Sequence, residues 1–140
     1  MTRWVLLPLA TLAPALAAPA ARAQQTDTLP LRVAKRQIEA FNRKDLDGVM
    51  LLFADDATMT EFPSGKVIGE NKAAIRARFD GLIKGMAKDF PVVRVEPRVV
   101  DGAFVLDRET WAAKPGQRNH AIWMYEIRGG LIRKAWTVRM

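Results

Sequence analysis

The hydrophobic pattern of this chain changes once, near Asp89, and that change limits the folds open to it. Before Asp89, apolar residues recur every three or four positions, the spacing that puts side chains on one face of an α-helix. After Asp89, apolar and polar residues alternate, as in strands with one buried face. The order therefore predicts an α+β domain, with helices first and antiparallel strands packed on them.

The first two expected helices have clear starting residues. Thr28 is a suitable N-cap for a helix that ends near Asn42. Asp45 caps a second helix, whose apolar face continues to Phe53. Gly48 inside this helix costs about 1 kcal/mol relative to alanine, so the helix must depend on packing.

A short hairpin separates these helices from the third. Residues Thr58–Phe62 alternate as a strand does, and Pro63-Ser64-Gly65 supplies turn residues. A third helix opens at Gly69 and Asn71 and buries a stripe that continues to Met86.

About four antiparallel strands follow, separated by glycine-containing turns at Asp101-Gly102, Pro115-Gly116 and Gly129-Gly130. Pro97 makes its segment an edge strand or a bulged one, because proline cannot donate to a ladder. The expected strands are residues 93–99, 104–112, 119–127 and 131–139.

If the last two turns are two-residue loops, Lys114 pairs with Gln117 and Arg128 pairs with Leu131, which sorts the side chains onto two faces. The face expected to be concave and to pack on the helices carries Phe104, Leu106, Arg108, Ala121, Trp123, Tyr125, Ile127, Ile132, Trp136 and Val138. The opposite face carries Val105, Asp107, Glu109, Trp111, His120, Ile122, Met124, Ala135 and Thr137. That second face is apolar enough to predict a homodimer formed through it.

The residue content excludes several kinds of chemistry. The chain has no cysteine and one histidine, His120, which rules out disulfides, zinc–thiolate sites, cysteine nucleophiles and two-histidine metal sites. Asp55 and Asp56 follow a helix and are interpreted as capping and turn residues rather than a metal pair. We expect neither a metal nor a cofactor. The net charge of +7 is spread along the chain, so nucleic acid is not an expected partner.

The first residues have the layout of a secretory signal peptide. Arg3 precedes an apolar run from Trp4 to Ala18, and Ala21-Arg22-Ala23 is a small-x-small cleavage site. Ala15-Leu16-Ala17 is an alternative cleavage site. A membrane anchor is less favoured, because prolines interrupt a run that is already short for a stable span. We expect a signal peptide at 1–23, a flexible leader at 24–29, a domain at 30–140, and a periplasmic or secreted protein.

The order of elements, together with one block of sequence, resembles a known superfamily. The block IEAFNRKDLDGVMLLFADDATMTEF, followed by Gly69 and Ile75, is similar to the nuclear transport factor 2-like superfamily, which includes the SnoaL-like polyketide cyclases and the ketosteroid isomerases. The resemblance implies a curved antiparallel sheet wrapped around three N-terminal helices as a cone, with a pocket at the open end. It implies no single activity, because this fold hosts enzymes and non-enzymatic binders.

Comparison with the ketosteroid isomerases places the catalytic base of that family at Glu61. The two oxyanion-hole positions fall at Gln37 and Trp123, and neither residue resembles the tyrosine and protonated aspartate of that mechanism. Steroid isomerisation is therefore not expected. Glu61 is either a general base with a raised pKa or the partner of Arg108 on the same face.

The expected pocket follows from the concave face. Glu61 is the catalytic candidate, and the candidate ligand-binding residues are Gln37, Met59, Arg108, Trp123, Tyr125 and Trp136. We expect a small apolar or carboxylate-bearing ligand. Two functions remain open: a cofactor-independent isomerase, cyclase or dehydratase that uses Glu61, and a non-catalytic ligand-binding or dimeric accessory domain of the cell envelope.

Overall fold

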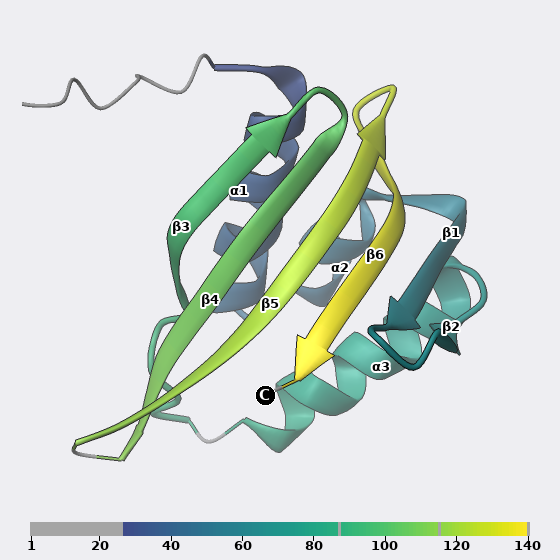
Figure 1. The fold of residues 1–140 in the computed structure, drawn as a ribbon. Helices are drawn as coiled ribbons and strands as arrows, with labels where there is room; N and C mark the ends of the chain where they lie inside the picture. The colour runs from purple at the N-terminus through teal and green to yellow at the C-terminus, as the bar shows by residue number, and fades with distance from the viewer. Residues whose placement is uncertain (1–26, 87, 115, 140) are drawn as a thin grey trace, which may run out of the picture.

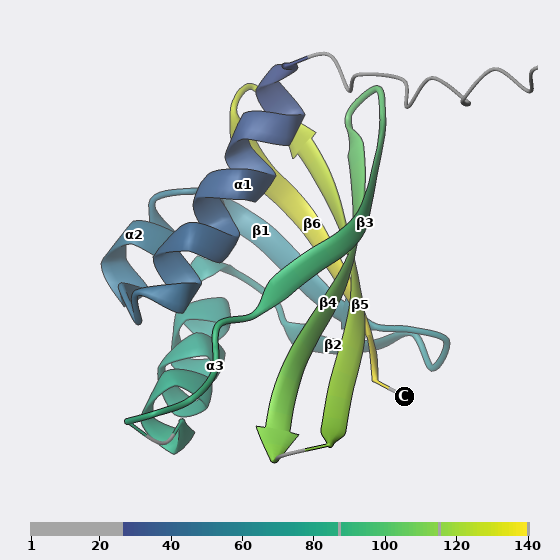
Figure 2. The same ribbon diagram turned by 90° about the vertical axis from the view of Figure 1, so that its left-hand side faces the viewer.

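The computed structural model describes residues 27–86, 88–114 and 116–139 and has an α+β architecture (Figure 1). The predicted signal peptide at 1–23 lies outside the described residues. The elements in chain order are α1 (Leu29–Asn42), α2 (Leu46–Met50), β1 (Phe53–Glu61), β2 (Lys66–Gly69), α3 (Lys72–Gly85), β3 (Arg94–Asp101), β4 (Phe104–Lys114), β5 (Gln117–Arg128) and β6 (Leu131–Arg139). The helices lie on one side of a single curved sheet (Figure 2).

The sheet has six strands in the order β2-β1-β6-β5-β4-β3, so β3 is an edge strand, as Pro97 predicted. Every pairing is antiparallel except β1 with β6, which run parallel. The predicted curved sheet packed on N-terminal helices is confirmed, and the parallel pairing of β1 with β6 departs from the antiparallel arrangement expected for it. The local turn signals could not reveal it, because these two strands come from opposite ends of the domain.

The helix caps follow the sequence signals. The Thr28 hydroxyl accepts a hydrogen bond from the Leu31 N–H, so α1 takes one residue of the predicted leader. The backbone N–H of Gly48 donates to Asp45 Oδ1 at 2.8 Å, and a Cβ at Gly48 would lie 2.3 Å from the Asp45 carboxylate. The glycine in this short helix is therefore required by the cap.

The second helix is shorter than predicted. It ends at Met50, and Phe53 begins β1 instead of ending the helix. The Ile132 N–H donates to the Leu52 carbonyl at 2.7 Å, which draws the chain onto β6. Sheet pairing overrides the helical spacing of the apolar residues here, because the backbone groups find their partners on another strand.

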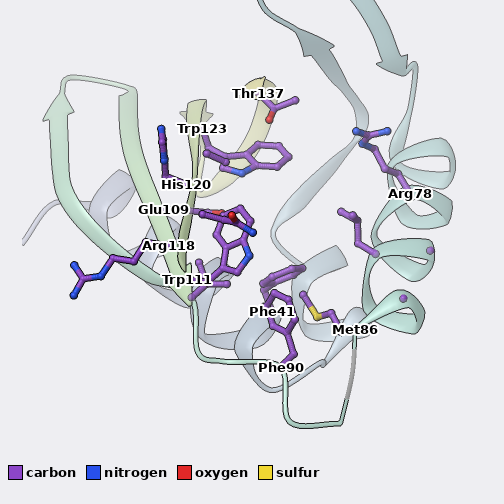
Figure 3. A pocket seen from close by; sticks show the side chains of 16 residues that line it. Phe41, Arg78, Met86, Phe90, Glu109, Trp111, Arg118, His120, Trp123 and Thr137 are labelled. Carbon is purple, nitrogen blue, oxygen red and sulfur yellow. The ribbon is translucent and has the colours of Figure 1, made fainter. Parts of the chain in front are cut away.

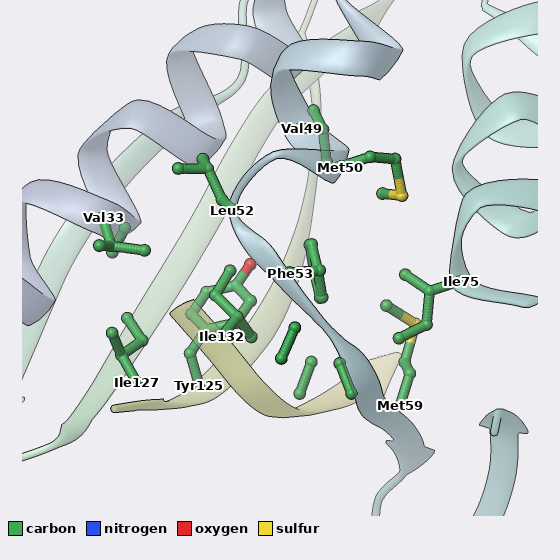
Figure 4. Close-up of a cluster of buried hydrophobic side chains, with 14 of the residues drawn as sticks. Val33, Val49, Met50, Leu52, Phe53, Met59, Ile75, Tyr125, Ile127 and Ile132 are labelled. Carbon is green, nitrogen blue, oxygen red and sulfur yellow. The ribbon is translucent and has the colours of Figure 1, made fainter. Parts of the chain in front are cut away.

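The core fills the space between the helices and the concave face of the sheet (Figure 4). Phe53, Met59, Ile75 and Ile132 are among its fully buried side chains. Gly69 allows the close approach of α3, because a Cβ there would lie 2.7 Å from the Ile75 side chain. In the part of the chain that the structure describes, no helix is both long enough and apolar enough to cross a bilayer.

Two β-bulges change which side chains face the core. In the β4–β5 pair, Lys114 opposes Gln117 as predicted, but one extra residue in β4 precedes the next pair, Ala112 with Arg118. In the β5–β6 pair, Ile127 opposes Ile132 as predicted, and an extra residue in β6 then shifts the register. Each bulge moves the rest of its strand by one residue, which exchanges the two faces.

The prediction of which side chains face the core is consequently wrong for β4 and for most of β6. On β5 it is confirmed: Trp123 and Tyr125 point inward, and Ile122 and Met124 point outward. The outward residues of β4 and β6 include Phe104, Leu106, Arg108, Trp136 and Val138. The inward residues of these strands include Val105, Asp107, Glu109, Trp111, Ala135 and Thr137.

Candidate functional site

A cavity of about 780 Å³ is lined by residues of α3, the end of α1 and the strands β4, β5 and β6 (Figure 3). This size suits a drug-sized organic molecule. The sheet contributes Glu109, Trp111, Arg118, Asn119, His120, Ala121, Trp123 and Thr137, and the helical side contributes Phe41, Arg78, Gly81, Leu82, Gly85, Met86, Phe90 and Val93.

Aromatic side chains form part of the cavity wall, among them Phe41, Phe90, Trp111 and Trp123. Trp123 stacks on Tyr125 with ring centroids 6.1 Å apart and planes at 5°. Phe79 from α3 lies 6.4 Å from Trp123 at an interplanar angle of 22°. These contacts fix the orientation of the Trp123 ring, so the wall it forms is preorganised for a planar ligand.

Two glycines leave room on the helical side. Gly81 and Gly85 lie four residues apart and both line the cavity, so they share one face of α3. A Cβ built at either position would meet no atom within 4 Å. The missing side chains therefore add to the space beside the sheet.

Glu109 is the acidic side chain on the cavity wall, and it is only 7% exposed. Burial, with a smaller contribution from the charge of Asp107, raises the pKa of Glu109 from 4.5 to about 8. Arg98 and the Trp123 indole N–H, which lies within hydrogen-bonding reach, lower this pKa by less. Glu109 therefore keeps its proton at neutral pH and loses it just above that range.

A buried ion pair supports Glu109 from behind. Arg98 Nε and Nη2 donate to the two oxygens of Asp107, each at 2.6 Å, and the Asp107 side chain is fully buried. Asp107 and Glu109 are two residues apart on β4, so their side chains lie on the same face of the strand. Arg98 reaches Asp107 from the neighbouring strand β3. The single guanidinium is engaged by Asp107 in a bidentate pair, so the proton on Glu109 is what neutralises the second carboxylate.

Two buried polar atoms lie deeper in the fold. Gln37 Oε1 and the Tyr125 hydroxyl have no hydrogen-bond partner among the described residues. Burial and the nearby carboxylates raise the pKa of Tyr125 well above its usual value, so its hydroxyl stays protonated. Neither residue lines the cavity, and the stacked Trp123 separates Tyr125 from it.

The structure brings together only part of the predicted pocket. Trp123 lines the cavity, whereas Tyr125 and Gln37 are buried behind its walls and Met59 belongs to the core. Glu61 is half-buried at the end of β1, beside Thr137 in the neighbouring strand, and is not among the lining residues.

Two predicted pocket residues face the other way. Arg108 is exposed on the outer face of β4, and Trp136 lies half-buried on the outer face of β6. The predicted Glu61–Arg108 pair is therefore wrong, because the bulge in β4 turns Arg108 away from the concave face. The same change of face brings Glu109 and Trp111 inward.

The sequence reasoning missed Glu109, Asp107, Arg98 and Arg78 as parts of the site. The sequence did contain a signal for Glu109 and Asp107. They are spaced by two from Val105 and Trp111, so all four residues share one face of a regular strand. The register predicted from two-residue loops instead placed Phe104 and Leu106 inside, because it did not include the extra residue in β4. Charged residues that break such a pattern often mark functional sites.

No group of three or more histidine, aspartate or glutamate side chains in the described ranges is arranged to hold a metal ion. The chemistry that the lining residues themselves supply is proton transfer and hydrogen bonding. Glu109 is placed for the first, and Trp123, Thr137 and Asn119 have polar groups for the second.

The sequence pattern of the SnoaL-like domain matches residues 34–135, which is most of the chain. The chain belongs to the SnoaL-like domain family. The cavity of this SnoaL-like domain, its conical α+β fold and its curved sheet agree with the resemblance to the nuclear transport factor 2-like superfamily. No curated protein sequence matched the chain.

Solved structures share the fold of this SnoaL-like domain at low sequence identity. A cystatin-fold protein of uncharacterized function from Novosphingobium aromaticivorans is 21% identical with a TM-score of 0.67, over 79% of this chain and 97% of that one. A candidate polyketide cyclase from Sinorhizobium meliloti is 20% identical with a TM-score of 0.62, over 76% and 93% of the two chains. A candidate ketosteroid isomerase from Kribbella flavida is 13% identical with a TM-score of 0.65, over 80% and 78%.

Proposed function

We propose that this SnoaL-like domain is a cofactor-independent enzyme that transfers protons on a small, flat, mostly apolar molecule. The observation that carries this proposal is Glu109, a buried carboxyl on the wall of an aromatic cavity with a pKa of about 8. Buried groups with strongly shifted pKa values in a pocket are candidates for general acids and bases.

The proposed chemistry needs only Glu109 as the proton carrier. In its ionised form, the carboxylate takes a proton from a carbon next to a substrate carbonyl. The carboxylic acid so formed returns the proton to another atom of the substrate. A pKa near the working pH suits both steps, because neither the acid nor the base form is scarce.

The surrounding residues orient this group. The Trp123 N–H lies within reach of the Glu109 carboxyl, and the stacked Tyr125 ring restrains Trp123. Arg98 and Asp107 are positioning residues, since they set the charge around Glu109 and do not line the cavity. Isomerases, cyclases and dehydratases all use proton transfer of this kind. Two solved structures of similar fold carry the names ketosteroid isomerase and polyketide cyclase, which supports the same class.

The test is proton exchange on a model ketone in D₂O. 2-Tetralone is a flat bicyclic ketone with acidic α-protons, and NMR can follow their loss. We expect the protein to accelerate exchange over buffer, with a rate that rises to a plateau above an apparent pKa of about 8. Glu109→Gln should lower the accelerated rate by roughly 100-fold or more.

Glu61→Gln is the matched comparison, because it makes the same change at the residue predicted from the sequence. The proposal is supported if Glu61→Gln accelerates proton exchange as much as the wild-type protein does and Glu109→Gln does not. The reverse result would restore Glu61 as the base. Binding of 2-tetralone without any accelerated exchange would support a non-catalytic ligand-binding domain instead.

We also propose that the protein is exported and forms a homodimer through the outer face of the sheet. Export rests on the signal-peptide pattern at 1–23. The dimer rests on apolar side chains on the outer face, where Phe104 is 43% exposed and Leu106 is 37% exposed beside half-buried Ile122, Met124 and Trp136.

A further inference from the structure

Two glycines of α3 are not explained by the packing of the fold. Glycine weakens a helix relative to alanine, so it is expected there only where a side chain would collide or where φ is positive. Gly48 and Gly69 meet the first condition, because a Cβ would lie 2.3 Å and 2.7 Å from the Asp45 and Ile75 side chains. Gly81 and Gly85 meet neither, since a Cβ there would have no atom within 4 Å and neither has a positive φ.

The same two glycines border the cavity. The part of α3 and its C-cap that lines the cavity consists of Arg78, Gly81, Leu82, Gly85 and Met86. Their spacing of three, one, three and one places them on one face of the helix. Both glycines are exposed although they lie on this face. The space that their side chains would fill is therefore part of the cavity.

The surroundings of these glycines are largely apolar. Leu82 and Met86 follow them on the helix, and Phe41 and Phe90 lie on the same side of the cavity as Met86 (Figure 3). Arg78, at the start of this face, already has an interaction partner within the protein. This side of the cavity is therefore suited to an apolar group.

We propose that Gly81 and Gly85 are specificity-determining residues, which admit an apolar ring on the side of the substrate remote from the reacting carbon. The inference rests on the proposed function and narrows its substrate. Glu109 belongs to the sheet wall of the cavity and the two glycines belong to its helical wall. A substrate whose reacting carbon lies at Glu109 thus turns its other side toward α3, where the missing side chains leave room.

A matched pair of ketones tests this inference through binding alone. 2-Tetralone and 6-phenyl-2-tetralone share the reacting ketone and differ in one phenyl ring at the far end of the molecule. Calorimetric titration gives their dissociation constants without any turnover. We expect the phenyl ketone to bind at least about tenfold more tightly, because the additional ring is removed from water.

Two leucine variants locate the additional ring. Gly81→Leu fills the space beside α3, so the affinity for the phenyl ketone should fall by about tenfold or more while that for 2-tetralone changes by less than about twofold. Ala77→Leu places the same side chain at an exposed position of the same helix that is not among the lining residues, and should keep the preference for the phenyl ketone.

The thermal stability of Gly81→Ala separates a role in specificity from a role in the fold. Alanine is the better helix former and its Cβ meets no atom within 4 Å, so this variant should melt a few degrees above the wild-type protein. Circular dichroism measures the melting temperature. A lower melting temperature would mean that the packing of α3 requires the glycine, which would overturn the inference.

Three binding results would also overturn it. Equal affinity of the wild-type protein for the two ketones excludes a place for the additional ring. Equal losses for both ketones in Gly81→Leu mean that position 81 does not select between them. Loss of the preference in Ala77→Leu places its origin outside the cavity. Failure of the proposed function is distinct, since it shows as absent exchange on both ketones while the binding preference and its loss in Gly81→Leu remain.

Discussion

At the scale of single residues, the arrangement of Arg98, Asp107 and Glu109 decides the electrostatics of the site. Two carboxyl groups are buried on one face of β4, and Arg98 forms a bidentate pair with one of them. Ionising both would leave an excess negative charge in a low-dielectric region, which is far more costly than keeping one proton. The proton remains on Glu109, whose pKa is raised, while Asp107 holds the guanidinium.

This arrangement predicts an unusual dependence of stability on pH. The pKa of Glu109 is about 8 in the folded protein and about 4.5 when unfolded. The folded state holds this proton more tightly, so the contribution of Glu109 to stability is complete below about pH 4.5 and is lost as pH rises to about 8. The loss approaches roughly 1.4 kcal/mol per pH unit within that window.

Glu109→Gln removes the titrating group and preserves its size. We expect the two proteins to have similar unfolding free energies near pH 5 and the variant to be more stable by roughly 2–4 kcal/mol near pH 8. Urea unfolding at several pH values measures this difference. Parallel pH profiles for the two proteins would contradict the raised pKa of Glu109.

At the scale of elements, bulges decide which residues form the cavity and which form the outer face. The extra residues in β4 and β6 turn Glu109 and Trp111 inward and Phe104 and Trp136 outward. A third bulge, at Pro97 in β3, lets Arg98 pair with Asp107. These irregularities bend and twist the strands, which is how a flat sheet becomes a curved wall.

A substitution on the outer face of the sheet tests the proposed dimer. Ile122 lies half-buried on this face of β5, so Ile122→Asp would place an unpaired charge in an interface at a cost of several kcal/mol. We expect sedimentation to report a dimer for the wild-type protein and a monomer for this variant. Leu51→Asp, at a 70% exposed position after α2, is the control and should remain dimeric. A wild-type monomer at high concentration would exclude the interface.

At the scale of the whole molecule, the cavity is formed only when the two halves of the chain meet. The helices come from residues before Asp89 and the strands β3 to β6 from residues after it, and the cavity takes its lining from both. The family match over residues 34–135 includes both the helices before Asp89 and most of the strands after it. The stretch before residue 27 lies outside the described residues and is interpreted from sequence alone.

Export is the prediction that belongs to this scale. The pattern from Arg3 to Ala23 predicts removal of the first residues during secretion. Intact-mass measurement of the protein from the cell envelope should find a chain that begins at Gln24, or at Ala18 if the alternative site is used. A full-length chain confined to the cytosol would contradict the signal peptide.

The sequence by itself determined the features that depend on neighbouring residues. Thr28 and Asp45 mark the helix starts, Gly129-Gly130 marks the last hairpin, and the change of period near Asp89 separates helices from strands. Each of these signals acts within a few residues through caps, turns and side-chain spacing. The resemblance to the superfamily could also be recognised from sequence, because the block around Phe53 that shows it is one continuous stretch.

Only the tertiary structure decided the composition of the cavity. One extra residue in β4 settles whether Arg108 or Glu109 faces inward, and that extra residue is defined by how β4 pairs with β5 rather than by the residues beside it. The same holds for the parallel contact of β1 with β6 and for the Arg98–Asp107 pair, whose partners lie on different strands. Alternation has a period of two, so a single-residue shift exchanges the faces while leaving every local signal unchanged.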